Sequence, residues 1–213
     1  CDNWVNLWCW FCYGIPKKWP AHEEITPCNP EYPYALTKYL GEQTVLHYDK
    51  VYNIPSLSLR LFNVYGPRSR TTGTYGAVFG TFLAQRLNKQ PFTIVGDGYQ
   101  SRDFTYVSDV VMAFRLAIAS EARGMAINIG SGQHHSIKEL ANNLGPNGVI
   151  HIPKRPGEPA ITQAEISRAI KHLAWRPKVS FNDGCKKMLD HIDYWKDAPV
   201  WTKETIDTAT KSW

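Results

Sequence analysis

The stretch PYALTKYLGEQTVLHYDKVYNIPSLSLRLF, residues 33–62, reads as one helix followed directly by one strand. Proline suits the first turn of a helix, so Pro33 marks the predicted start, and Asn53 with Pro55 marks the end. The next residues, SLSLRLF, have leucine at every second position, which is the period of a strand with one buried face. A long helix joined to such a strand is typical of an α/β fold, in which helices cover a sheet.

The rest of the chain continues this alternation of helices and strands, without an internal repeat. We expect the helix that follows FTYV to be capped by Ser108 or Asp109. Ser136 and Glu139 have the spacing of a capping box, which predicts that a helix opens there. Further helices are predicted over residues 77–88, 166–175 and 184–195, and strands over 92–95, 126–130 and 149–153.

Composition excludes several classes of protein. Of the 213 residues, 43% are hydrophobic and 20% are charged, which is typical of a globular domain. The net charge of +5 comes from scattered lysines and arginines, so no nucleic-acid partner is expected. No apolar run reaches the roughly 20 residues of a membrane-spanning helix, and no signal peptide is recognisable. We therefore expect a cytoplasmic protein without a membrane partner.

The five cysteines are Cys1, Cys9, Cys12, Cys28 and Cys185. Because their number is odd and their spacing uneven, they do not form a disulfide framework, and free thiols are expected. Cys9 and Cys12 form a single C-x-x-C without a second pair. A metal or redox use of that motif is weighed against plain free thiols, and no metal site is predicted.

Tyr34 and Lys38 are four residues apart in the predicted helix, which places them on one face. A phenol is a poor base at neutral pH, but nearby positive charge favours its ionised form, which can take a proton from a hydroxyl group. The same spacing is also common by chance in an ordinary amphipathic helix. By itself, the pair leaves both interpretations open.

Several motifs in a fixed order give the pair more weight. They are CYGIPKKWPAHEEITPCNPEYPYALTKYLGEQ, LRLFNVYGPR, GDGYQSRDFTYVSDVV, NIGSG, and RPGEP with EISRAIKHLAWRPKVSF. Together they resemble the nucleotide-sugar epimerase/dehydratase family, the extended short-chain dehydrogenases. The resemblance runs from about Tyr13 to about Tyr194 and so covers most of the chain.

The resemblance implies an α/β fold with a Rossmann domain for NAD and a smaller substrate domain. The family's G-x-x-G-x-x-G turn does not occur in the sequence. We therefore expect the C-terminal part of a Rossmann-type parallel sheet plus a smaller α/β lobe that binds a nucleotide sugar, with the N-terminal NAD-binding half missing. Residues 1–75 are expected to belong to the first part and residues 76–213 mainly to the second, with the chain crossing between them.

By the same resemblance, Tyr34 is the general base, and Tyr34 with Lys38 holds the nicotinamide ribose of NAD. The family's third catalytic residue, a serine or threonine four residues before Tyr13-Gly14, corresponds to Cys9, which is a weaker hydrogen-bond donor. Dehydratases and decarboxylases of the family carry a glutamate two residues before that Tyr-Gly. Phe11 stands there, which favours simple epimerisation.

The residues expected to bind the substrate also follow from the resemblance. Asn63, Arg102 and Arg155 match positions that hold the diphosphate, for which a guanidinium offers a planar fork of donors. Glu158 matches a residue on the nucleotide ribose. The remaining positions are Thr93 and Val95, where the base packs, and Thr162, whose small side chain is expected to leave room for an N-acetyl group.

The implied activity is reversible 4-epimerisation of a UDP-hexose, in which hydride passes to NAD and returns to the other face of a 4-keto sugar. A 4,6-dehydratase or a reductase of nucleotide sugars is the first alternative. The second is an inactive fragment that binds a nucleotide sugar. Members of the family form homodimers, and for this chain the oligomeric state is left open.

Overall fold

The computed structural model describes residues 4–69, 78–154, 158–202 and 205–206, and for residues 4–9 it describes only the backbone. The described chain divides into two compact units, and each unit collects segments that are distant in sequence. Unit 1 consists of residues 1–64, 102–134 and 161–178, and unit 2 of residues 65–101, 135–160 and 179–213. The assignment of separate cofactor and substrate roles to the two parts of the chain stays a prediction.

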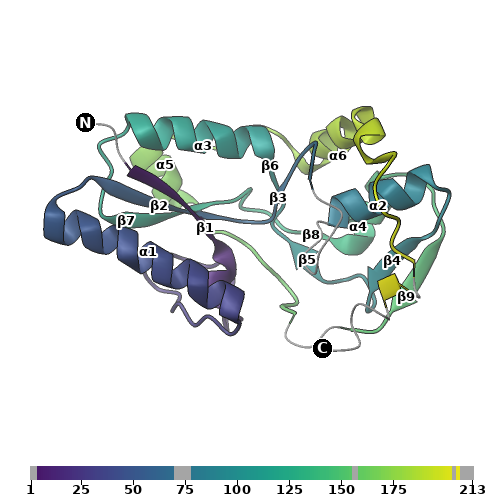
Figure 1. The fold of residues 1–213 in the computed structure, drawn as a ribbon, viewed down its shortest axis with the longest axis horizontal. Coiled ribbons are helices and arrows are strands. Elements are labelled where there is room, and N and C mark those ends of the chain that lie inside the picture. The colour runs from purple at the N-terminus through teal and green to yellow at the C-terminus, as the bar shows by residue number, and fades with distance from the viewer. Residues whose placement is uncertain (1–3, 70–77, 155–157, 203–204, 207–213) are drawn as a thin grey trace. The chain divides into compact units, whose positions relative to one another are not determined.

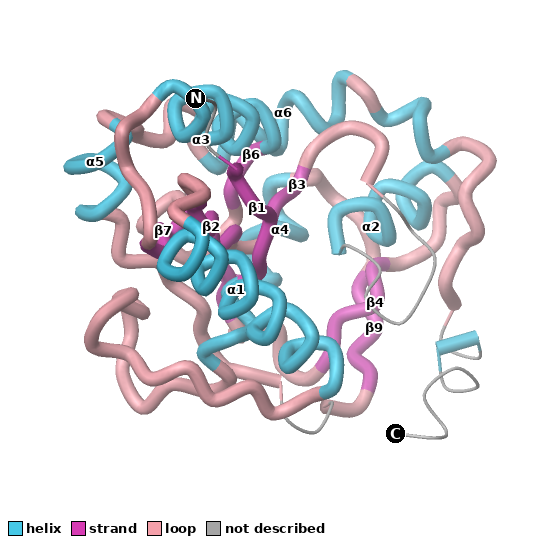
Figure 2. The backbone as a smooth tube through the Cα atoms, turned by 60° about the vertical axis from the view of Figure 1, so that its left-hand side comes forward, coloured by secondary structure: helices cyan, strands magenta, loops and turns pink. Residues whose placement is uncertain are grey.

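Unit 1 is built on a parallel sheet with the strand order β1-β2-β7. Its strands are β1 (Trp4–Cys9), β2 (Ser56–Leu61) and β7 (Met125–Ile129). The helix α1 (Pro33–Tyr52) lies on one side of the sheet, and α3 (Val107–Ala119) lies on the other (Figure 1). Figure 2 shows the same arrangement with α1 on the near side. The helix and strand predicted from residues 33–62 are confirmed.

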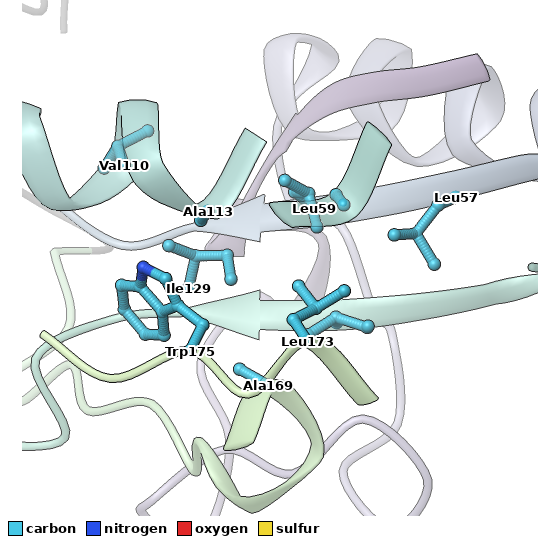
Figure 3. Close-up of a cluster of buried hydrophobic side chains, with 10 residues drawn as sticks. Leu57, Leu59, Val110, Ala113, Ile129, Ala169, Leu173 and Trp175 are labelled. Carbon is cyan, nitrogen blue, oxygen red and sulfur yellow. The ribbon is translucent and has the colours of Figure 1, made fainter. Parts of the chain in front are cut away.

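The main hydrophobic core of unit 1 lies between the sheet, α3 and α5 (Ser167–Leu173) (Figure 3). Leucines of β2 and isoleucines of β7 meet small residues of both helices, and Trp175 closes one end of the cluster. The Trp175 Nε1–H donates to the carbonyl oxygen of Asp109 at 2.9 Å. Because alanines at Ala113, Ala117 and Ala169 take little space, the helices can lie close to the strands.

The second face of β2 is also buried, which the alternation of leucines did not predict. Ser56, Ser58 and Arg60 point away from the leucine face, yet each is buried. A central parallel strand is covered on both faces. Here the polar face lies against α1, whose acidic side chains provide hydrogen-bond partners.

The predicted cap of α3 is wrong. The helix begins at Val107, and Tyr106, with an extended backbone, stands at the N-cap without a side-chain cap hydrogen bond. The Asp109 carboxylate instead accepts a hydrogen bond from the backbone N–H of Lys178 at 3.0 Å. The Asp109 side chain is therefore engaged in a tertiary hydrogen bond and does not cap the helix.

Unit 2 contains a parallel pair of short strands, β4 (Phe92–Val95) and β9 (Val149–Ile152). Ser136 caps α4 as predicted, because its hydroxyl oxygen accepts from the Glu139 N–H at 3.0 Å. The unit's helices are α2 (Val78–Leu87), α4 (Ile137–Asn143), α6 (Phe181–Asp190) and the 3₁₀ turn η2 (Ile192–Trp195). The other short strands among the described residues are β3 (Val64–Tyr65), β5 (Ser101–Arg102), β6 (Thr105–Tyr106) and β8 (His135–Ser136).

Among the described residues, none of the helices combines the length and the hydrophobicity that crossing a bilayer requires.

Candidate active site

Tyr34 and Lys38 lie on one face of α1, as their spacing predicted. The Lys38 Nζ is 5.4 Å from the centroid of the Tyr34 ring, within the range of a cation–π contact. Tyr34 is 41% exposed, and Lys38 is half-buried. Pro33 occupies the first turn of the helix, so this pair stands at the N-terminal end of α1. A ligand can therefore reach both the phenol and the ammonium.

Phe11, which lies outside α1, contacts the ring of Tyr34. It belongs to the 3₁₀ turn η1 (Trp10–Tyr13), which follows β1, and its ring meets that of Tyr34 edge-on with centroids 5.8 Å apart. Next to this turn, Gly14 has a φ of +63°, and a Cβ there would overlap the carbonyl oxygen of Asn29. Tyr13 and Gly14 therefore form a turn whose second position accepts only glycine.

Cys9, the third predicted catalytic residue, is the last residue of β1 and lies opposite Leu61 of β2. Its backbone position, two residues before Phe11, is at the carboxyl end of the sheet. Ligands of open parallel sheets bind outside this end of the strands. The Cys9 side chain lies outside the described part of the chain, so its polarising role stays a prediction.

A buried ion pair fixes α1 against the sheet, and sequence reasoning missed it. The Glu42 carboxylate accepts from Arg60 Nε at 2.9 Å and from Arg60 Nη2 at 2.6 Å, and it also accepts from the Ser58 hydroxyl at 2.7 Å. Arg60 Nη1 donates to the Tyr13 hydroxyl at 2.7 Å, which in turn donates to Asn128 Oδ1 at 2.8 Å. One network therefore joins α1, β2, η1 and β7.

The ionisation of this network is set by burial and pairing. The Arg60 and Glu42 side chains are only 6% and 1% exposed. Burial raises the pKa of Tyr13 above its ordinary value of 10, so the hydroxyl remains a neutral donor toward Asn128. Glu42 is one helical turn after Lys38, and so a network that holds Glu42 also sets how α1 presents Tyr34.

Asp49 anchors the other end of α1. Its carboxylate accepts from the backbone N–H of Ser56 at 3.1 Å and from Arg123 Nη2 at 2.6 Å. The hydrogen bond from Arg123 is the main cause that lowers the pKa of Asp49 below its ordinary value of 3.8. Two carboxylates seven residues apart on the inner face of α1 therefore attach the helix to the sheet.

We expect an Asp49→Asn variant to lose stability at neutral pH but not at acid pH. The folded-state pKa of Asp49 is lowered, so its stabilisation is fully present above the unfolded value near 3.8 and is lost as the pH falls through the folded value. Urea unfolding of both proteins at pH 7 and at successively lower pH measures this. The gap between their free energies of unfolding should begin to narrow near pH 3.8 and should close once the pH is below the lowered folded-state value. The exposed Asp197→Asn change is the control, and a gap independent of pH would contradict the assignment.

Asp103 organises the predicted substrate residues of unit 1 although it was not itself predicted. It is fully buried, and its carboxylate accepts from the backbone N–H groups of Ser131, Gly132 and Ala164 at 2.6, 3.1 and 2.9 Å. The Ser131 hydroxyl adds a bond of 2.7 Å. Burial raises the pKa of Asp103, and these hydrogen bonds oppose that effect. The carboxylate thus holds the loop after β7 to the segment around residue 164.

Asn63 and Thr162 are brought together beside Asp103. The Thr162 hydroxyl donates to Asn63 Oδ1 at 2.9 Å and accepts from the Asp103 N–H at 3.1 Å. Thr162 is fully buried, so in this structure its hydroxyl supports Asn63, and the sugar-size role stays a prediction. Arg102, the neighbour of Asp103 in sequence, is only 7% exposed, which disfavours the interpretation as an ordinary surface arginine.

The other predicted substrate residues lie in unit 2. Thr93 on β4 is buried, with its N–H donating to Gln85 Oε1 at 3.2 Å and its hydroxyl accepting from Gln85 Nε2 at 2.8 Å. The Val95 carbonyl accepts from Gln100 Nε2 at 2.7 Å. Glu158 is exposed. Arg155 lies outside the described residues.

Comparison with known proteins gives one family and several relatives. The sequence pattern described as the NAD dependent epimerase/dehydratase family matches residues 11–130. The UDP-glucose 4-epimerase of Mycolicibacterium smegmatis is 34% identical over 186 residues, which cover 84% of this chain and 58% of that protein. The UDP-glucuronic acid decarboxylase 2 of Arabidopsis thaliana is 32% identical over 83% of this chain and 41% of its own length.

Solved structures give the same picture. The UDP-glucuronic acid 4-epimerase of Bacillus cereus, in complex with UDP-glucuronic acid and NAD, has a TM-score of 0.81 and 34% identity, and the match covers 90% of this chain and 62% of that one. The UDP-N-acetylglucosamine 4-epimerase of Methanobrevibacter ruminantium has a TM-score of 0.85 and 27% identity, over 90% of this chain and 63% of that one. The chain therefore spans about three-fifths of the length of several proteins that it matches.

Proposed function

The chain belongs to the NAD dependent epimerase/dehydratase family, and from that premise we propose that it carries the catalytic helix and substrate residues of a UDP-hexose 4-epimerase. The proposed substrates are UDP-glucose and UDP-galactose, with N-acetylated UDP-hexoses as further candidates. The relatives named as 4-epimerases of UDP-sugars support this substrate class.

The arrangement of Tyr34, Lys38 and Phe11 is the observation that carries the proposal. Tyr34 presents an accessible phenol beside an ammonium group, and positive charge near a phenol favours the phenolate needed for proton abstraction. The apolar ring of Phe11 contacts Tyr34, and by the family resemblance Phe11 occupies the position at which dehydratases and decarboxylases carry a glutamate. Without that carboxylate, simple loss and return of the C4 hydrogen is favoured over elimination.

NAD, the cofactor of the family, supplies a hydride acceptor when it is bound. The residues that fit it here are Tyr34 and Lys38, which are both accessible and can address the hydroxyl groups of the nicotinamide ribose. Tyr34 then holds the proton taken from the sugar hydroxyl and returns it at the end of the reaction. The anchoring of α1 through Glu42 and Asp49 keeps this phenol in a fixed place.

The remaining residues are assigned to the nucleotide. We assign Asn63, Arg102 and Arg155 to the diphosphate, Glu158 to the ribose, and Thr93 with Val95 to the base. The support for Asn63 and Arg102 is their shared environment next to Asp103, which holds three chain segments together. A guanidinium with little exposed surface pairs more strongly with a diphosphate than one in open solvent, because water screens it less.

A second function of the same family is considered because one relative is a UDP-glucuronic acid decarboxylase and another is a dTDP-4-dehydro-6-deoxyglucose reductase. Product analysis separates the possibilities. With UDP-galactose and NAD, an epimerase yields UDP-glucose of unchanged mass, whereas a dehydratase yields a 4-keto-6-deoxy sugar. A chain that binds nucleotide without turning over any sugar would match the binding-fragment alternative.

Calorimetric titration of the 213-residue chain with UDP, GDP and dTDP tests the substrate assignment. We expect saturable binding of UDP that is stronger than that of the other two. An Arg102→Gln change should weaken UDP binding by about 10- to 100-fold, because a charge-assisted hydrogen bond contributes about 1.5–3 kcal/mol. The exposed Arg115→Gln change in α3 is the matched control and should have no effect. Equal affinity of the wild type and the Arg102 variant would contradict the diphosphate role.

A further inference from the structure

Two cysteines from separate segments meet beside the site, and neither belongs to the function proposed above. Cys12 lies in η1 and is almost fully buried, and Cys28 lies in the segment that leads into α1 and is partly exposed. Both pack in the cluster around Trp10 and Phe62. Their thiols interact by a hydrogen bond, and both cysteines are free. Among the cysteines whose side chains are described, Cys12 therefore pairs with Cys28.

We propose that Cys28 is a peroxide-reactive thiol and that Cys12 resolves its oxidised form as a Cys12–Cys28 disulfide. This thiol chemistry depends on the packing, exposure and charged neighbours of the two cysteines and is independent of the epimerase assignment.

The surroundings of the two thiols determine which one reacts with peroxide and which one resolves the oxidised form. The hydrogen bond from Cys12 is the main cause that lowers the pKa of Cys28, while burial opposes it. The same bond, followed by burial, raises the pKa of Cys12. Arg60 favours both thiolates, and Glu42 disfavours them. Because the thiolate is the nucleophile, Cys28, which is also the more accessible thiol, reacts first.

The proposed oxidation consumes one molecule of hydrogen peroxide for each disulfide that forms. The Cys28 thiolate attacks one peroxide oxygen, the O–O bond breaks, and hydroxide leaves, so that Cys28 becomes a sulfenic acid. The Cys12 sulfur then attacks Cys28 Sγ, the S–S bond forms, and the S–O bond breaks. The leaving hydroxide takes the Cys12 proton as water. Two electrons pass from the thiols to peroxide, and the protein loses two hydrogen atoms.

The disulfide would join two elements that flank Tyr34. Phe11, the residue before Cys12, contacts the Tyr34 ring, and Cys28 lies six residues before that tyrosine. To form the bond, the two sulfurs must approach to about 2.05 Å. The new bond closes a loop of about 15 residues, which limits the motion of the segment between η1 and α1.

Peptide mapping of the reduced 213-residue chain after treatment with hydrogen peroxide tests the proposal. We expect a loss of about 2 Da in intact mass, which corresponds to one disulfide. Trypsin cleaves after Lys17 and Lys18, so Cys12 and Cys28 fall in different peptides that only a disulfide can join. The linked peptides should be absent from Cys12→Ala and Cys28→Ser variants and present in a Cys9→Ser variant.

Alkylation and thermal unfolding supply independent readouts. Iodoacetamide should modify Cys28 at least ten times faster than Cys185, because burial raises the pKa of Cys185 to about 12. The oxidised chain should melt about 6–12 °C higher than the reduced chain, and Cys28→Ser, a change at a partly exposed site, should abolish that rise. A linked peptide that persists in Cys12→Ala, or a Cys185 that reacts as fast as Cys28, would overturn the proposal.

Discussion

Replacing Glu42 by glutamine is expected to lower the free energy of unfolding by about 3–5 kcal/mol. The change keeps the shape of the side chain but removes the negative charge that faces Arg60. The Arg60 guanidinium is 6% exposed, and two of its nitrogens donate to Glu42. An amide in place of the carboxylate leaves a buried positive charge uncompensated, and it presents N–H groups where acceptors are needed.

Urea unfolding at pH 7 measures this loss. The exposed Glu121→Gln change is the matched control and should stay within about 0.5 kcal/mol of the wild type. A double variant, Glu42→Leu with Arg60→Met, should recover much of the lost stability, because it removes both charges together. If Glu42→Gln costs less than about 1 kcal/mol, the ion pair does not hold α1 to the sheet as we infer.

If the proposed function is correct, replacing Tyr34 by phenylalanine in the NAD-loaded protein is expected to reduce kcat for 4-epimerisation of UDP-galactose by about 10²- to 10⁴-fold. Phenylalanine keeps the ring that contacts Phe11 and Lys38 but removes the hydroxyl that is proposed to take the proton. The affinity for UDP should not change, because Tyr34 is assigned to the sugar and the cofactor and not to the diphosphate.

The control for this change is Tyr48→Phe on the same helix. Tyr48 is exposed to a similar degree as Tyr34, so its variant reports any general effect of losing a tyrosine hydroxyl from α1. Turnover is followed by separation of the two UDP-hexoses, and UDP binding by calorimetry. A Tyr34→Phe variant with nearly full kcat would rule out Tyr34 as the base. Equal loss in both variants would indicate a structural effect on α1.

Local sequence patterns predicted the elements that carry the site. Pro33 and the apolar residues that follow it predicted α1, and the Ser136 and Glu139 spacing predicted the start of α4; the structure confirms both. The spacing of Tyr34 and Lys38 predicted that they share a helix face, which the contact between them confirms. Such features depend on residues within a turn or two of one another, so a short window of sequence contains the information.

At two positions a partner that is distant in sequence overrides the local pattern. Asp109 has the side chain of a helix cap, but it bonds to Lys178, which lies far along the chain. Arg60 has the position of an outward-facing strand residue, but Glu42 of α1 covers it. In both cases a partner brought by the fold outcompetes the local preference, since a buried charged group must find its hydrogen bonds wherever they are available.

By itself, the sequence determined the α/β class and the face of α1 that carries Tyr34 and Lys38. Through an ordered set of motifs, it also indicated the family. Only the tertiary structure decided which side chains meet: Glu42 with Arg60, Asp103 with Ser131 and Ala164, Thr162 with Asn63, and Cys12 with Cys28. The physical reason is that helix and strand signals are local and periodic, whereas these pairs depend on strand register and on how helices pack against the sheet. A single sequence contains no short-range pattern for such long-range pairs.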